Sequence, residues 1–129
     1  MGIVKIKTTK KAKDEFKLSQ LKVQKGKCPL TGRTVTMRTG VIDHDHVTGR
    51  IRAILTNGTN RAEGIINKAL TQWAGMTTKQ EKIKFLRNLA DYYEAVPLPF
   101  IYPTHKTDDE KRIARNKKAR LAYKKSKLN

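Results

Sequence analysis

Residues 42–55 read IDHDHVTGRIRAIL, and this stretch decides the fold predicted for the chain. An apolar pair, Val41-Ile42, leads into the Asp-His-Asp-His run, and residues 46–49 then have the composition of a tight turn. Residues 50–55 alternate basic and apolar side chains, which predicts a returning strand that pairs with the first. The stretch therefore predicts a β-hairpin.

The alternation also predicts which way the side chains of the returning strand point. Successive residues of a strand face opposite sides of the sheet, because the backbone is pleated. Ile51 and Ala53 would then share one face of the hairpin. Arg50 and Arg52 would share the other.

The segments on either side of the hairpin extend the unit. Residues 34–38 alternate and are rich in β-branched side chains, which indicates a strand that Gly40 interrupts. After the hairpin a second turn leads to Thr59 or Asn60, and either could cap a helix with its side-chain oxygen. Apolar residues at helical spacing predict that helix over residues 61–74. The order of elements is that of a ββα unit.

Helices and basic segments flank this unit along the chain. Residues 1–27 are rich in lysine and are expected to form a basic N-terminal arm with a short helix. Residues 28–75 form the expected ββα core, and residues 76–129 a helical, basic C-terminal region that binds DNA. The predicted fold class is α+β, because one hairpin and several helices would build a single small domain.

The charge of the chain points to a polyanionic partner. Its 129 residues carry 29 Lys and Arg against 11 Asp and Glu, a formal net charge of +18. Nucleic acid offers a dense line of phosphates to such a charge. An anionic membrane surface is the rival partner, but it would need a strongly amphipathic helix, which no segment clearly provides. DNA is therefore the expected partner, and no membrane association is expected.

Two further features bear on the compartment. No stretch reaches the roughly 20 apolar residues of a membrane span, and the N-terminus lacks the apolar centre of a signal peptide. Cys28 is the only cysteine, so no intrachain disulfide can form. A reducing cytoplasm is the expected location.

The Asp-His-Asp-His run carries residue types that phosphodiester hydrolysis needs. That reaction requires a hard cation to neutralise developing charge and a base to activate water. Asp43 offers a hard oxygen ligand, and Asn60 offers a second, since a ββα unit folds the helix start back against the first strand. On an extended strand Asp43 and Asp45 would face one side. His44 and His46 would face the other, and an imidazole suits the base because it titrates near neutral pH.

The order and spacing of these residues resemble a known family. The pattern is IDHDH at 42–46, TGRIR at 48–52, Leu55, Asn60 and AEG at 62–64. In this pattern the chain is similar to the phage recombination endonuclease VII family, a branch of the HNH superfamily. The resemblance, over about residues 28–66, implies that Asp43 and Asn60 bind a divalent metal, Mg²⁺ or Mn²⁺. It also implies that His44 is the general base and that His46 helps to position the phosphate or the water.

One feature of the family is missing from this sequence. The family usually has a zinc site of four cysteines in two CxxC pairs, and the matching positions here are Cys28, Thr31, Thr56 and Thr59. One thiolate cannot hold a structural zinc. We therefore expect no structural zinc, with hydrogen bonds among the threonines and local apolar packing in its place.

Several residues have a plainer interpretation beside the functional one. Asn60 could simply cap the helix, and Glu63 is taken as a solvated helix residue outside the metal set. Arg50 and Arg52 could be an ordinary solvated strand face, but beside a phosphodiester site they are expected to contact phosphate. The same role is expected of the basic C-terminal residues Lys111, Arg112, Arg115, Lys117 and Lys118.

Two functions of different classes follow from these residues. The first is a metal-dependent DNA endonuclease that nicks DNA, cuts both strands or cleaves branched DNA. The second is a non-enzymatic DNA-binding protein on a decayed HNH fold, and the intact Asp43, His44, His46 and Asn60 favour the enzyme. An RNA-binding protein would explain the charge but not the Asp-His run. The sequence leaves the DNA structure cut and the oligomeric state open, with a homodimer as one option. A phage gene would place the protein in the cytoplasm of a bacterial host.

Overall fold

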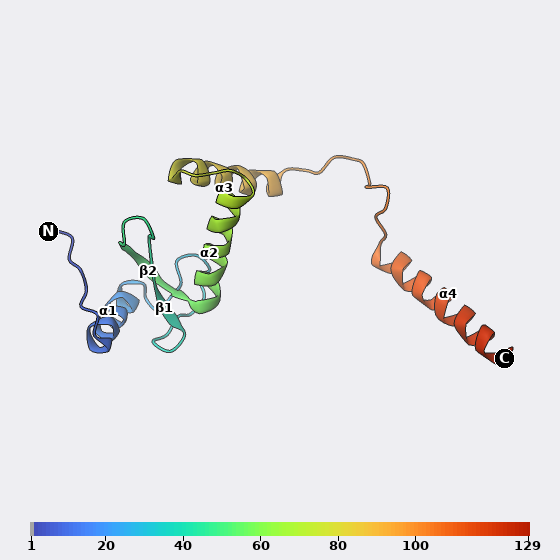
Figure 1. Ribbon diagram of the computed structural model, residues 1–129, viewed down its shortest axis with the longest axis horizontal. Helices are drawn as coiled ribbons and strands as arrows, with labels where there is room; N and C mark the ends of the chain where they lie inside the picture. Colours follow the sequence, from blue (N-terminus) through green and yellow to red (C-terminus); the bar gives the residue numbers. More distant parts are fainter. Residues whose placement is uncertain (1) are drawn as a thin grey trace. The chain divides into compact units, whose positions relative to one another are not determined.

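The fold is of the α+β class, as the sequence predicts. A computed structural model describes residues 2–129, which contain four helices and one two-stranded antiparallel sheet (Figure 1). The chain divides into two compact units, Met1–Ala90 and Asp91–Asn129. In chain order the elements are α1 (Lys10–Val23), β1 (Gly40–His44), β2 (Ile51–Thr56), α2 (Asn57–Gln72), α3 (Lys79–Glu94) and α4 (Asp108–Lys127).

The predicted hairpin is confirmed. β1 and β2 pair antiparallel, with Gly40 opposite Thr56 and Asp43 opposite Ala53. The turn is closed by two backbone hydrogen bonds, from the Asp45 N–H to Arg50 at 2.8 Å and from the Gly49 N–H to Asp45 at 2.7 Å. A two-stranded hairpin is marginally stable alone, so it needs packing from other elements.

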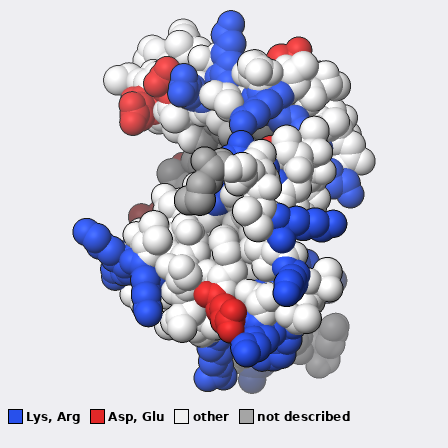
Figure 2. Space-filling model, turned by 90° about the vertical axis from the view of Figure 1, so that its left-hand side faces the viewer, with Lys and Arg blue, Asp and Glu red and all other residues white. Residues whose placement is uncertain are grey.

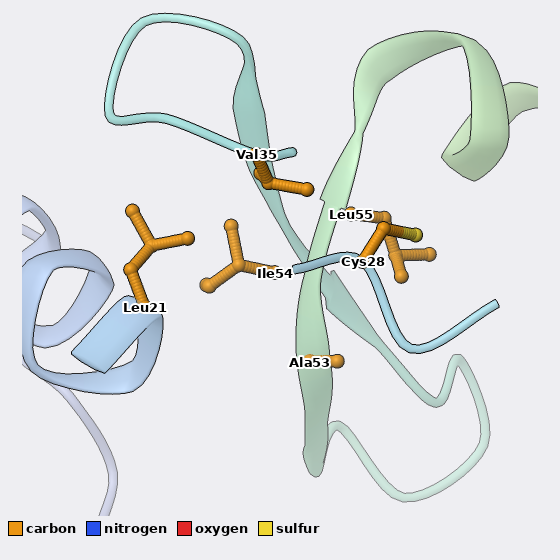
Figure 3. Close-up of a cluster of buried hydrophobic side chains, with 6 residues drawn as sticks. All are labelled: Leu21, Cys28, Val35, Ala53, Ile54 and Leu55. Atoms are coloured by element: carbon orange, nitrogen blue, oxygen red, sulfur yellow. The ribbon is translucent and has the colours of Figure 1, made fainter. Parts of the chain in front are cut away.

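The core lies where α1 packs against the hairpin. Figure 3 shows its buried side chains, and among them Ile54 is fully buried and Cys28 is 1% exposed. Helix α1 contributes Leu21, so the helix within the lysine-rich N-terminal segment is part of the packed unit. The cluster consists of Leu21, Cys28, Val35, Ala53, Ile54 and Leu55, with Phe16 and Ile42 packed against it.

Gln24, the C-terminal cap residue of α1, joins the helix to the outer edge of β2. Its side-chain N–H donates to the Ile54 carbonyl at 2.9 Å, and its side-chain oxygen accepts from the Ile54 N–H at 2.8 Å. These two bonds satisfy the backbone of a strand edge that would otherwise be buried without a partner.

Replacing Gln24 with alanine is expected to lower the free energy of unfolding by about 2 kcal/mol or more. Both backbone groups of Ile54 would lose their partners, and an unsatisfied buried polar group costs about 1–3 kcal/mol. A urea titration followed by circular dichroism measures the change. The matched control is Gln80→Ala on an exposed position of α3. A loss equal to that of the control would contradict the role given to Gln24.

The strand predicted over residues 34–38 is wrong. Thr34 forms only an isolated bridge with Lys27, and residues 36–39 form a turn. The hydroxyl of Thr39 accepts from the Thr36 N–H at 3.0 Å, and the hydroxyl of Thr36 accepts from the Thr39 N–H at 3.2 Å. These local bonds compete with a strand ladder for the same backbone groups.

Gly40 ends this turn because no side chain fits there. A Cβ at Gly40 would lie 2.7 Å from Cγ2 of Ile54 and 2.9 Å from Cγ1 of Val35. The glycine that interrupts the apolar pattern in the sequence therefore marks the point where the turn enters β1.

Helix α2 begins earlier than predicted and follows β2 without a loop. The residue that caps it is Thr56, the last residue of β2, whose hydroxyl accepts from the Thr59 N–H at 3.3 Å. The predicted caps Thr59 and Asn60 lie inside the first turn of the helix. The cap interpretation of Asn60 is therefore wrong, and its half-buried side chain is available for another role.

Candidate active site

Asp43 lies at the end of β1, where the hairpin is irregular. The pairing passes from Asp43–Ala53 to His44–Ile51, so Arg52 is an extra residue in β2. Such a bulge re-aims a side chain, and Arg52 here turns to the side of Asp43. The sequence predicts that Arg52 and Ala53 point to different faces of the hairpin. This alternation is wrong at Arg52 because of the bulge.

Arg52 binds Asp43 through both carboxylate oxygens. Nε donates to Oδ2 at 2.7 Å and Nη2 donates to Oδ1 at 2.9 Å. Asp43 is only 6% exposed, so its charge needs such a partner. The hydrogen bond to Asp43 raises the pKa of Arg52 above its ordinary value, and the guanidinium keeps its charge at any relevant pH.

Glu63 completes this cluster from α2. Its Oε2 lies 3.2 Å from Nη2 of Arg52, so the guanidinium lies between carboxylates from a strand and a helix. The sequence interpretation of Glu63 as a solvated helix residue is wrong. Its position one helical turn after Asn60 was the available signal, because residues three apart share a helix face.

The two histidines lie on the exposed side of the same strand end. The rings of His44 and His46 stack with centroids 4.7 Å apart and an interplanar angle of 30°, as expected for alternate residues. Asp45 between them has a structural role, because its Oδ1 accepts from the Val47 and Thr48 N–H groups. The bond from Thr48, followed by that from Val47, lowers the pKa of Asp45.

The oxygen donors near Arg52 suit a hard divalent cation. No three His, Cys, Asp or Glu side chains gather around one point within residues 2–129. Mg²⁺ does not need three, because it commonly keeps several waters and binds one or two carboxylates plus phosphate. The guanidinium between Asp43 and Glu63 stands where a cation is already favoured. Asn60 lies in the first turn of α2, three residues before Glu63, and makes no side-chain contact with Asp43, Arg52 or Glu63 among residues 2–129.

A cleft of about 560 Å³ adjoins this cluster. Its wall includes His46, Arg52 and Glu63, and α3 contributes Lys79 and Lys82. Its apolar lining includes Ile66, Leu70, Ile83 and Leu86. Neither lysine was predicted from the sequence, because only the packing of α3 beside α2 brings them near the hairpin.

Comparison with known protein families places this chain in one of them. The family described as recombination endonuclease VII matches residues 4–95. The chain belongs to this family. The endonuclease VII match begins before α1 and reaches beyond α3, so it covers more of the chain than the motif in the sequence. A comparison with curated proteins gives no match.

Membership of the endonuclease VII family identifies the chain as a DNA endonuclease, and DNA as its substrate. The charge of the molecule agrees with that substrate. Lys and Arg side chains are spread over the face shown in Figure 2, where acidic side chains are few. Within residues 2–129, no helix is both long and apolar enough to span a membrane.

The endonuclease has threonine hydrogen bonds at the positions that hold zinc cysteines in the family the sequence resembles. The Thr56 hydroxyl donates to that of Thr59 at 2.7 Å. Burial raises the pKa of the Cys28 thiol, but hydrogen bonds from Thr31 and nearby backbone groups outweigh it and lower the pKa overall. The predicted hydrogen bonds among these residues are thus present.

The basic C-terminal residues of the endonuclease lie on α4, in the second compact unit. Every residue of this helix is exposed, and its start has a capping box between Thr107 and Glu110. Lys111 and Arg112 form surface ion pairs with Asp108 and Asp109, at 3.9 and 3.2 Å. Such pairs are weak, so they leave these side chains able to bind phosphate.

Proposed function

We propose that this endonuclease hydrolyses phosphodiester bonds of DNA with a divalent cation, Mg²⁺ or Mn²⁺, at a ββα-metal (HNH) site. The observation that carries the proposal is the cluster at the end of β1. There a buried Asp43 faces Glu63 of α2 with a cationic group between them, beside the exposed pair His44 and His46. Carboxylates that hold a cation and a nearby imidazole are the groups that this hydrolysis requires.

Asp43 and Asn60 would hold the cation in this proposal. When bound, the cation supplies charge that neutralises the phosphate as negative charge develops on it. His44 takes a proton from the attacking water while the water oxygen forms its bond to phosphorus. The bond from phosphorus to the leaving sugar oxygen then breaks, and that oxygen keeps the bonding electron pair and takes a proton from solvent. His46 holds the phosphate or the water in position. The exposure of both rings leaves room for a DNA backbone to approach.

DNA binding is assigned to basic side chains in both units. Arg50 lies at the exposed turn of the hairpin, and Lys79 and Lys82 line the cleft beside the site. Such contacts hold the phosphates and set the register of the duplex. The C-terminal helix would add Lys111, Arg112, Arg115, Lys117 and Lys118.

One observation favours a second function. Both oxygens of Asp43 already accept hydrogen bonds from Arg52, which would suit a protein that binds DNA without cutting it. A decayed site of this kind would keep its DNA affinity and show no cleavage with any cation.

Metal removal tests the proposal. The protein is incubated with plasmid, branched and single-stranded DNA, with Mg²⁺, with Mn²⁺ or with EDTA. We expect cleavage with the cations, none with EDTA, and recovery when Mg²⁺ is added back. EDTA should leave the melting temperature unchanged, and elemental analysis should find far less than one zinc per chain, because one thiolate cannot hold the ion. Cleavage that persists in EDTA, or stoichiometric zinc, would contradict the assignment.

A further inference from the structure

Arg52 uses both oxygens of the carboxylate that the proposed function assigns to the metal. Its three contacts are 2.7 and 2.9 Å to Asp43 and 3.2 Å to Glu63. Metal–oxygen bonds are about 2.1 Å long for Mg²⁺, and two positive groups repel each other strongly at such separations. A cation therefore cannot bind Asp43 while the guanidinium stays in this position.

Arg52 is nevertheless free to leave. Its side chain is 41% exposed, whereas that of Asp43 is 7% exposed. Within residues 2–129 its guanidinium bonds only to Asp43 and Glu63. It also lines the cleft, so rotation about its side-chain bonds moves the charge toward solvent without moving the backbone.

We infer that Arg52 is a resident counter-cation that occupies the active site before metal and DNA arrive. The inference rests on the proposed function and adds a positioning residue to it. A divalent cation displaces the guanidinium from Asp43 and Glu63, and the guanidinium then binds a DNA phosphate in the cleft. Because DNA gives Arg52 another anionic partner, DNA and metal bind cooperatively, and each raises the affinity for the other by the same factor.

A purely structural role for Arg52 predicts the opposite result. If the ion pairs only fastened α2 to β1, the loss of Arg52 would disturb the carboxylates and weaken metal binding. If Arg52 only contacted phosphate, its loss would leave metal binding in the absence of DNA unchanged. Of the three roles, only that of a counter-cation predicts tighter metal binding when Arg52 is removed.

The test is Mn²⁺ binding to the full chain without DNA. The affinity is measured by calorimetry and by electron paramagnetic resonance of free Mn²⁺. We expect Arg52→Gln to bind Mn²⁺ at least about tenfold more tightly than the unchanged protein, since a competing charge is gone. The matched control is Arg61→Gln at an exposed position of α2, which removes one charge but no contact to Asp43. It should bind like the unchanged protein.

Further variants separate the outcomes. Arg52→Lys keeps the charge but cannot bind both oxygens side by side, so its Mn²⁺ affinity should lie between the two. If Arg52→Gln does not fold, the Mn²⁺ affinity of Arg52→Lys tests the inference in its place. A short DNA duplex is then added to two proteins that both carry His44→Ala, which slows cleavage. The duplex should raise the Mn²⁺ affinity more in the protein that keeps Arg52 than in the one with Arg52→Gln.

The inference and the proposed function fail in different ways. Equal or weaker Mn²⁺ binding by Arg52→Gln, with cation-dependent cleavage by the unchanged protein, overturns the inference alone. Asp43→Asn combined with Arg52→Gln should lose the tight Mn²⁺ site. Mn²⁺ binding that survives this double substitution, together with cleavage in EDTA, overturns the proposed function.

Discussion

Replacing His44 with alanine should lower the single-turnover rate of DNA cleavage by about 10²-fold or more. A lost general base has an effect of this size, because the attacking water then keeps its proton. DNA affinity should stay nearly unchanged, since His44 is exposed and not part of the core cluster, so its loss leaves the fold and the basic side chains in place. The measurement is the cleavage rate at saturating DNA and Mg²⁺.

The control for this prediction is His105→Ala in the segment before α4. His105 is exposed and lies in the second unit, and within the described part of the chain its one hydrogen bond runs from its backbone N–H to the Tyr102 carbonyl. It should cleave like the unchanged protein. Full activity in His44→Ala would remove His44 from the mechanism and direct attention to His46.

Deletion of residues 107–129 should weaken DNA binding across all sequences alike and reduce its dependence on salt. The span from Lys111 to Lys127 carries nine Lys and Arg, all of them exposed. Each phosphate contact on a duplex contributes about −0.9 to the slope of log affinity against log salt. The loss of the five contacts assigned to α4 would flatten that slope by about 4 to 5 and reduce affinity by orders of magnitude at low salt. A salt titration of binding measures both quantities.

Cleavage by the deleted protein should survive at saturating DNA and low salt. None of the proposed catalytic or metal-binding residues lies beyond Asn60, and no α4 residue belongs to the core cluster. A chain with glutamine at Lys111, Arg112, Arg115, Lys117 and Lys118 is the matched control for charge alone. An unchanged salt slope, or a protein inactive at saturation, would show that α4 is not an electrostatic anchor.

The sequence predicts the parts of the fold that depend on local pattern. The hairpin was predictable because its turn and its alternating strand lie within fourteen residues. Residues 34–38 have the composition of a strand but do not form one. The hydrogen bonds between Thr36 and Thr39 form a turn there instead of a strand. That turn requires the glycine at position 40, because a side chain there would collide with Ile54.

The site is only partly predictable for a related reason. The stacking of His44 and His46 follows from strand alternation, but the position of Arg52 follows from a bulge that no composition signals. Lys79 and Lys82 reach the cleft through the packing of α3 beside α2, and such contacts between distant segments are not encoded in a local pattern.

The junction between β2 and α2 has a consequence for how the active site moves. Because the strand passes into the helix at Thr56 without a loop, there is no hinge between Arg52 and Glu63. The two elements therefore behave as one rigid body, and adjustment to a substrate comes from side-chain rotamers, which change in picoseconds to nanoseconds when exposed. The active site thus joins a backbone that has no loop at this junction to one exposed side chain, that of Arg52.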